Sequence, residues 1–336
     1  YFPVGKLPAG VLDELLARAP IEDPSVVVCP GVGLDCAVVE VGDRLLVAKS
    51  DPITFVADDL GRYLVQINAN DIATTGATPR WLLLTLLLPE AQADRALVES
   101  IMDQVGAGCR EMGVTLIGGH TEITHGLDRP IAVGALLGEV TRERLVTPRG
   151  ASPGDRVLLT KGVPIEGTAI IADAFAGRLR GVLNDSELER ARAFSRDPGI
   201  SVWRDARVAM AAGRVTAMHD PTEGGLATAL WELAEASGRG LRIDPSAIPI
   251  PALSARACEA LGVDPLGLIA SGALLLTVAA EDAAAVVAAL KTAGVACADI
   301  GEVREGPAVV EQRTDAGVQP MPMPERDEIA RLFEAG

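Results

Sequence analysis

Apolar and polar residues alternate along the first part of the chain with spacings that predict both strands and helices. Two apolar runs at residues 36–41 and 44–50, separated by Gly42 and Asp43, predict a β-hairpin with a tight turn. The uninterrupted apolar run at residues 81–88 predicts a strand that is buried on both faces. Helices are predicted at residues 11–16, 58–72 and 93–112, the second with Asp58 as N-cap and Gly76 as its stop, and further strands at residues 26–29, 114–117 and 131–137.

The second part of the chain begins after a polar stretch rich in turn residues, residues 141–155, which we interpret as a domain boundary. We therefore expect two α/β or α+β domains, at residues 1–145 and 150–312, each with a sheet that carries helices on one face, and a tail at residues 313–336. Strands are predicted here at residues 156–160, 215–218, 273–279, 296–303 and 308–311, and helices at residues 165–176, 186–194, 201–212, 226–236, 255–261, 282–292 and near residue 325.

Composition and charge narrow the class of protein. The 336 residues carry a net charge of −16, which argues against a nucleic-acid partner but permits a phosphate ligand that arrives with divalent cations. The apolar run at 81–88 is shorter than the roughly 20 residues of a membrane span, and no signal peptide is evident. Five scattered cysteines without a C-x-x-C pair favour a reducing compartment. We expect a soluble cytoplasmic protein that binds no membrane.

Four aspartates stand where glycine- or proline-containing segments meet the predicted strands and helices. Asp35 and Asp51 flank the hairpin, Asp71 follows Asn68 by one helical turn, and Asp220 precedes a glycine-rich turn that opens a helix. Carboxylates in such positions are suitable ligands for Mg²⁺ together with phosphate oxygens, and the backbone N–H groups at the start of a helix bind anions. Taken singly, each aspartate is better explained as a cap or turn residue, whereas the four together favour a metal–phosphate site.

A second polar cluster consists of Gly118 and Gly119 followed by His120, Thr121 and Glu122, after a predicted strand. Two glycines there would allow a ligand to approach the backbone closely. The chain has three histidines, and the other two, His125 and His219, also lie in glycine-rich segments, so both structural and ligand roles stay open. The P-loop, nucleophile-elbow and H-E-x-x-H motifs are absent from the sequence, and the dinucleotide fingerprint is incomplete.

The order of these polar segments resembles the superfamily of aminoimidazole ribonucleotide (AIR) synthetase. Its members include thiamine-monophosphate kinase, selenophosphate synthetase and the hydrogenase-maturation protein HypE, to which the present motifs are most similar. The resemblance implies a two-domain AIR synthetase-like fold, ATP bound in a cleft through Mg²⁺, and homodimers whose N-terminal mixed sheets join into a barrel. The matching stretches are residues 33–38, 49–51, 70–79, 118–121 and 220–226.

The resemblance also implies roles for individual residues. Asp71, Asp220 and His120 would be catalytic, and the close-approach backbone would be that of Gly118 and Gly119. The metal–phosphate ligands would be Asp35, Asp51, Asp71, Glu122 and Asp220, and the nucleotide contacts Lys6, Asn68, Gly118, Gly119, Thr121, Glu223, Gly224 and Gly225.

Three departures from HypE change the expected chemistry. His120 stands where HypE usually has aspartate, and a neutral imidazole is a poor Mg²⁺ ligand, so Glu122 would replace it or one ion would be lost. Glu223 stands where HypE usually has arginine. The C-terminal cysteine that accepts the carbamoyl group in HypE has no counterpart, because the last cysteine of this sequence is Cys297. We therefore expect a separate small-molecule acceptor.

The favoured hypothesis is an enzyme that uses Mg²⁺ and ATP to phosphorylate a small substrate, with or without a following dehydration. A phosphotransferase like thiamine-monophosphate kinase is the first alternative. A nucleotide-binding partner in metallocofactor assembly that does not catalyse is the second. A transition-metal hydrolase site built from His120, Glu122, His125 and His219 is the third.

Overall fold

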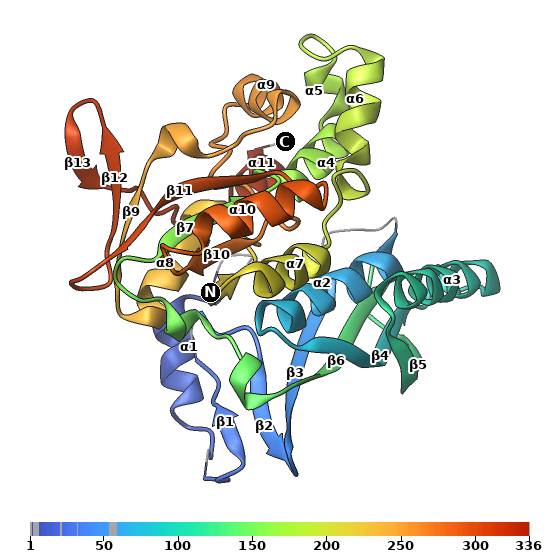
Figure 1. Cartoon of the computed structure of the whole chain (residues 1–336). Coiled ribbons are helices and arrows are strands. Elements are labelled where there is room, and N and C mark those ends of the chain that lie inside the picture. The colour runs from blue at the N-terminus through green and yellow to red at the C-terminus, as the bar shows by residue number, and fades with distance from the viewer. Residues whose placement is uncertain (1, 3–6, 21, 32, 54–58, 336) are drawn as a thin grey trace. The chain divides into compact units, whose positions relative to one another are not determined.

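The computed structural model describes residues 2, 7–20, 22–31, 33–53 and 59–335. Its residues cluster into two compact units (Figure 1). Among the described residues, no helix combines the length and the apolar character that crossing a membrane requires. The N-terminal unit comprises Pro20–Pro30 and Asp35–Leu145, and the C-terminal unit comprises Tyr1–Ala19, Gly31–Leu34 and Val146–Gly336.

The N-terminal unit is a six-stranded mixed sheet with the strand order β1-β2-β3-β6-β4-β5. Its β4–β5 pair is parallel and its other pairs are antiparallel. Helix α2 packs on β3, β6 and β4, and α3 packs on α2. The elements are β1 (Val26–Val28), β2 (Ala37–Val41), β3 (Arg44–Ile53), α2 (Leu60–Thr74), β4 (Thr78–Pro89), α3 (Arg95–Met112), β5 (Thr115–Thr124) and β6 (Ile131–Val140).

The predicted hairpin is confirmed, with Val41 opposite Arg44 across the turn. Its second strand is longer than predicted and continues through Pro52 to Ile53. Proline lacks a backbone N–H, so it fits a strand only where one edge needs no donor. Here β2 pairs with β3 no further than Ala48, and beyond that residue β3 pairs with β6 alone.

Helix α2 lies close to the sheet because β6 has glycine beneath it. A Cβ atom on Gly134 would lie 2.7 Å from Nδ2 of Asn68, and one on Gly138 would lie 2.5 Å from Cγ2 of Ile72. Both approaches are too short for any other residue, so these glycines fix the depth of α2. The residue before α2 is Asp59, whereas the predicted N-cap Asp58 lies outside the described residues.

The prediction that residues 81–88 are buried on both faces is wrong. Leu82 and Leu86 are fully buried, whereas Leu83 on the opposite face of β4 is 39% exposed. The reason is that α2 covers only one face of this sheet, and no described helix of the unit packs on the outer face that carries Leu83.

Strand β5 also differs from its prediction, which ended it at residue 117, before the glycine pair where a ligand was expected to approach the backbone. The strand continues through Gly118 and Gly119 to Thr124 at the edge of the sheet. Gly119 has a φ of 148°, and a Cβ there would lie 1.8 Å from the carbonyl oxygen of Leu84. The pairing of β5 with β4 therefore requires glycine at this position.

The C-terminal unit is a seven-stranded mixed sheet with the strand order β13-β12-β9-β11-β7-β10-β8, in which only the β12–β9 pair of described strands is parallel. Its strands are β7 (Arg156–Thr160), β8 (Val215–His219), β9 (Gly240–Ile243), β10 (Leu275–Val278), β11 (Cys297–Arg304), β12 (Val310–Thr314) and β13 (Gly317–Pro320). Its helices are α1 (Ala9–Leu16), α4 (Ile165–Ala174), α5 (Ala176–Leu179), α6 (Asp185–Arg192), α7 (Trp203–Ala212), α8 (Gly225–Ser237), α9 (Ala252–Leu261), α10 (Ala283–Thr292) and α11 (Glu328–Ala335).

Helices cover both faces of this sheet, so the expectation of helices on one face is wrong here. On one face Leu159 and Leu275 pack with Leu230 of α8 in a buried apolar cluster. Their neighbours Leu158 and Leu276 point to the other face and are also fully buried. Helices α7 and α10 contact each other and the strands β8 and β11 (Figure 1). The short elements β9, β13 and α5 were not predicted.

Candidate functional site

A cluster of carboxylates surrounds Lys49 in the N-terminal unit. Lys49 and Asp51 are two residues apart on β3 and therefore face the same way, toward α2. The Lys49 Nζ lies 3.3 Å from Oδ2 of Asp51 and 3.2 Å from Oδ2 of Asp71 on α2. The Lys49 and Asp71 side chains are 13% and 4% exposed, so solvent does little to screen this pair.

The charge of Lys49 is held by more than one carboxylate. Burial alone would lower the pKa of Lys49, but the negative charges of Asp71, Asp35 and Asp51 raise it above its ordinary value. Cys36 fixes the segment that carries Asp35, because its thiol donates to the carbonyl oxygen of Asp71 over 3.2 Å. Two carboxylates thus form ion pairs with one ammonium group and a third acts on it through its charge, so the cluster retains negative charge that a divalent cation would neutralise.

Asn68 is enclosed within the protein. Its Oδ1 accepts the N–H of Asp51 at 3.0 Å, and its Nδ2 donates to the carbonyl oxygens of Leu64 at 2.9 Å and Asp51 at 3.4 Å. Because its amide group forms hydrogen bonds with the backbone of β3, Asn68 positions Asp51 relative to α2. Its predicted direct contact with a nucleotide stays a prediction.

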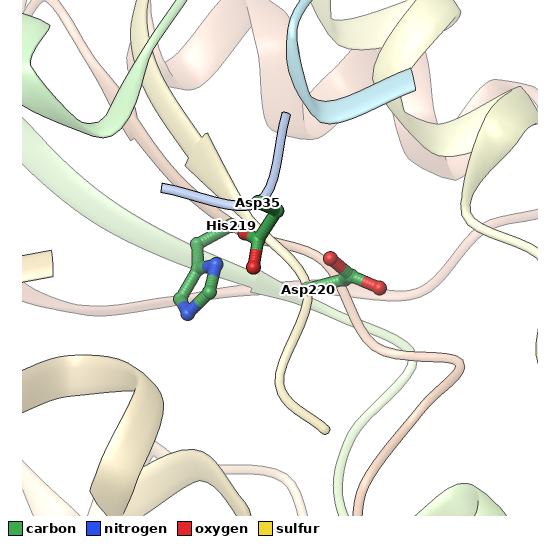
Figure 2. Close-up of side chains that lie close together, drawn as sticks. All are labelled: Asp35, His219 and Asp220. Atoms are coloured by element: carbon green, nitrogen blue, oxygen red, sulfur yellow. The ribbon is translucent and has the colours of Figure 1, made fainter. Parts of the chain in front are cut away.

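In the C-terminal unit, His219 and Asp220 stand at the end of β8 (Figure 2). The two side chains are 3% and 1% exposed, and a ring nitrogen of one lies within 4.8 Å of a carboxylate oxygen of the other. Nε2 of His219 lies 2.8 Å from Oε2 of Glu232 on α8, a hydrogen bond that fixes the orientation of the ring.

The glycine-rich turn after Asp220 has the geometry predicted for it, but its N–H groups have acceptors within the protein. Gly224 and Gly225 have φ values of 84° and 65°, and a Cβ on Gly225 would lie 2.4 Å from the carbonyl oxygen of Leu266. The N–H of Gly224 donates to Oδ2 of Asp327 over 2.5 Å, and that of Gly225 to the carbonyl oxygen of Thr222 over 3.0 Å. A carboxylate of the same chain thus already accepts the N–H of Gly224, which was expected to bind an anion.

The residues predicted around β5 lie on an exposed strand. His120 Nε2 is 3.3 Å from Oε2 of Glu122, and His125 Nδ1 is 2.7 Å from Oε2 of Glu90. Within the described part of the chain, no group of three potential metal ligands includes His120, Glu122 or His125. Within that part of the chain, the four residues of the transition-metal hypothesis therefore do not form one ligand group. Lys6 lies outside the described residues.

Several site residues were missed by the sequence analysis. Lys49 had a detectable signal, its i, i+2 spacing from Asp51 on a predicted strand. Glu232 and two buried carboxyl groups, Glu166 and Asp327, had none, because their partners are distant in the chain. Burial raises the pKa of Glu166 to about 7 and that of Asp327 to about 6.

Comparison with known proteins identifies the class to which this fold and these motifs belong. Residues 33–140 match the N-terminal domain, and residues 152–313 the C-terminal domain, of the family described as AIR synthase related proteins. The chain belongs to this family, which confirms the resemblance found in the sequence.

Several similar proteins have names that refer to hydrogenase maturation, as does a solved structure with the same fold. The chain is 32% identical to carbamoyl dehydratase HypE of Cupriavidus necator over 285 residues, which cover 82% of this chain and 78% of the relative. A structure of HypE in complex with ATP superposes with a TM-score of 0.71 at 24% identity, covering 98% of both chains. Thiamine monophosphate kinase from Aquifex aeolicus shares the fold, with a TM-score of 0.65, 20% identity and coverage of 90% and 95%.

Proposed function

We propose that this protein is a HypE-like enzyme that binds ATP with Mg²⁺ and phosphorylates, then dehydrates, an acceptor that carries an amide group. The observation that carries the proposal is the cluster around Lys49, whose buried ammonium group forms ion pairs with Asp51 and Asp71 and also feels the charge of Asp35. The chemistry of these donors fits Mg²⁺, which prefers carboxylate oxygens and completes its shell with phosphate oxygens. Two further findings support it: the relative named carbamoyl dehydratase and the HypE complex with ATP.

In this proposal Asp35, Asp51 and Asp71 hold the cation, and we assign a metal-binding role also to Asp220 of the C-terminal unit. Bound Mg²⁺ would neutralise the charge that develops on the transferred phosphoryl group. Lys49 holds the carboxylates of Asp51 and Asp71 in place before any ligand binds. Asn68 keeps Asp51 at a fixed distance from α2 through the backbone hydrogen bonds described above.

The proposed reaction balances in two steps. The amide oxygen of the acceptor attacks the γ-phosphorus, and the bond to ADP breaks. The phosphorylated intermediate then loses inorganic phosphate together with its two N–H protons, which leaves a carbon–nitrogen triple bond. The amide oxygen and one proton thus leave with the phosphate, and the second proton passes to solvent.

Three of the five cysteines are poor candidates for the acceptor group. Burial raises the pKa of the Cys258 and Cys297 thiols to about 12, and also raises that of Cys109. These thiols remain protonated at neutral pH and are poor nucleophiles. A separate acceptor molecule or a partner protein would supply the group that is phosphorylated.

We further propose that two copies join through the outer faces of their N-terminal sheets, as the family resemblance implies. Leu83 is 39% exposed on that face, and Trp81, Val133 and Leu137 beside it are only partly buried. Apolar side chains grouped on one sheet face in this way gain free energy when a second sheet covers them.

The substitution Asp71→Asn tests the metal role. It keeps the size of the side chain but removes a ligand charge, so we expect the affinity for Mg²⁺-ATP, measured by calorimetry, to fall at least about tenfold. Asp103→Asn, on the exposed side of α3, is the matched control and should bind as the unmodified protein does. Equal affinities for the two variants would contradict the proposal. ADP with a phosphorylated acceptor, and no free phosphate, would indicate a kinase instead.

A further inference from the structure

Four adjacent strands of the C-terminal sheet carry a row of alternating charges. Glu302 on β11 stands opposite Arg156 on β7 and opposite Arg242 on β9. Arg242 in turn stands opposite Glu311 on β12, and its Nη2 donates to Oε2 of Glu311 at 3.2 Å. Both neighbours of Arg242 along β9 belong to the apolar cluster that packs with α8. Because successive side chains of a strand alternate between faces, the charged row lies on the face that points away from α8.

A bulge in β11 brings a further carboxylate to this face. Asp299 and Glu302 are three residues apart on β11, yet their partners on β7 are residues 158 and 156. The extra residue in β11 keeps both carboxylates on the same face of the sheet. Both oxygens of Asp299 accept hydrogen bonds from Arg156, each at 2.8 Å. These bonds fix the position of the guanidinium through Nε and Nη2 and leave its Nη1 for another partner.

A cavity of about 160 Å³ lies over this part of the sheet, entirely within the C-terminal unit. Three guanidinium groups contribute to its lining, and the third of them, on β12, is exposed: Arg156, Arg242 and Arg313. Three carboxylates also contribute, and the first of them directly follows β9: Asp244, Asp299 and Glu302. The formal charges of these six side chains cancel. Cavities of about 150 Å³ in proteins hold ligands of the size of benzene, so this one has room for a small ion or molecule.

The three guanidinium groups retain N–H donors that the protein does not use. The Nε of Arg242 is buried and has no hydrogen-bond partner among the described residues. The Nη1 of Arg156 lies 3.7 Å from Oε2 of Glu302, which is too far for a hydrogen bond. The described residues include no hydrogen-bond partner for the guanidinium of Arg313, whose charge acts on Asp244. A buried donor without an acceptor costs free energy, and an oxygen atom of a ligand would recover it.

Each carboxylate of the lining, in contrast, already accepts hydrogen bonds within the protein. Both oxygens of Asp299 are bonded as described above. Oε1 of Glu302 accepts from Nη1 of Arg304 at 3.1 Å. Oδ1 of Asp244 accepts from the N–H and the hydroxyl group of Ser246 at 3.0 and 2.6 Å. The carboxylates are thus partly neutralised while guanidinium donors remain unused, which favours a ligand that supplies acceptors, an oxyanion, over a cation.

We propose that this cavity binds a phosphate group, either the free ion or the phosphoryl group of a small ester, through Arg156, Arg242 and Arg313. The three guanidinium groups come from three different strands, so a tetrahedral oxyanion uses their donors more fully than a planar carboxylate does. Phosphate is smaller than benzene and therefore fits the cavity. The inference does not rest on the proposed function, because Mg²⁺, ATP and the carboxylates around Lys49 take no part in it.

Calorimetric titration with inorganic phosphate in the absence of Mg²⁺ tests the proposal. The substitution Arg242→Gln removes a positive charge and the buried Nε donor, so the affinity for phosphate should fall at least about tenfold. Arg239→Gln, at an exposed position just before β9, is the matched control and should bind phosphate as the unmodified protein does. If the unmodified protein does not bind phosphate, or if the two variants bind it equally well, the proposed site is overturned.

A second test uses the unmodified protein and does not depend on the fold of a variant. Crystals soaked in tungstate, a heavy tetrahedral analogue of phosphate, should show anomalous scattering beside Arg156, Arg242 and Arg313. Anomalous scattering that occurs only elsewhere would refute the site.

Competition titrations identify the form of the ligand. Tighter binding of methyl phosphate than of inorganic phosphate would support a phosphate ester, and the reverse order would support the free ion. Acetate that binds as tightly as phosphate would contradict a site for a tetrahedral oxyanion. The test of Mg²⁺-ATP binding with Asp71→Asn is separate, so either proposal can fail without the other.

Discussion

Replacing Lys49 by methionine removes the positive charge of the carboxylate cluster while keeping the length of the side chain. At 3.2 Å and an effective dielectric constant of about 20, the attraction between Lys49 and Asp71 is about 5 kcal/mol before desolvation is subtracted. The more exposed Asp51 adds less than about 1 kcal/mol. Removal of one partner from a buried ion pair typically costs about 3–5 kcal/mol, and we expect the free energy of unfolding to fall by about 3 kcal/mol.

Urea denaturation followed by circular dichroism measures this loss, with and without Mg²⁺. Without Lys49 the carboxylates repel one another, so a cation that binds them should stabilise the variant more than the unmodified protein. Mg²⁺ at a hundred times its dissociation constant would restore about 2.7 kcal/mol. The control is Lys291→Met in the exposed last turn of α10, which should change neither the stability nor its dependence on Mg²⁺.

Two outcomes would refute this reasoning. A Lys49→Met variant as stable as the control would mean that the carboxylates do not depend on the ammonium group for their charge balance. A destabilised variant that Mg²⁺ does not rescue would confirm the ion pair but would count against a cation site at Asp35, Asp51 and Asp71.

Two other predictions concern the buried acid and the outer sheet face. Burial raises the pKa of Glu166 from 4.5 to about 7, so ionisation of this carboxyl group lowers the free energy of unfolding as pH rises through that interval. The substitution Glu166→Gln should therefore raise the free energy of unfolding by up to about 3 kcal/mol at pH 8 and by almost nothing at pH 4. Urea titrations at the two pH values measure this difference. An equal gain at both pH values would show that charge is not the cause. Leu83→Asp should abolish the dimer in sedimentation experiments without loss of secondary structure, and a monomeric unmodified protein would exclude the proposed sheet-to-sheet contact.

The sequence predicted local features well because they depend on neighbouring residues. The hairpin at Gly42 and the helix stop at Gly76 follow from backbone conformation, with φ values of 62° and 77°. Strand β5 was predicted to end at residue 117 because glycine is uncommon inside strands, and the close contact between Gly119 and Leu84 appears only in the folded sheet.

In the candidate site, too, residues within local motifs were predicted, whereas pairings between distant parts of the chain were not. Asp51 and Asp71 were found through their motifs, and the structure brings both to Lys49. The closure of Gly224 by Asp327 was beyond prediction, because the two residues are 103 positions apart and no local pattern links them. Pairings across such separations depend on how the whole unit packs.

The close contact between Gly119 of β5 and the backbone of β4 affects how related sequences should be compared. Any side chain at this position would collide with the main chain of β4, so purifying selection would retain the glycine even in a homologue that has lost every ligand. Its presence in an alignment is therefore a marker of intact strand pairing. Surveys that seek inactive members of the family should instead follow Asp71, whose replacement leaves the backbone free to adopt the same path.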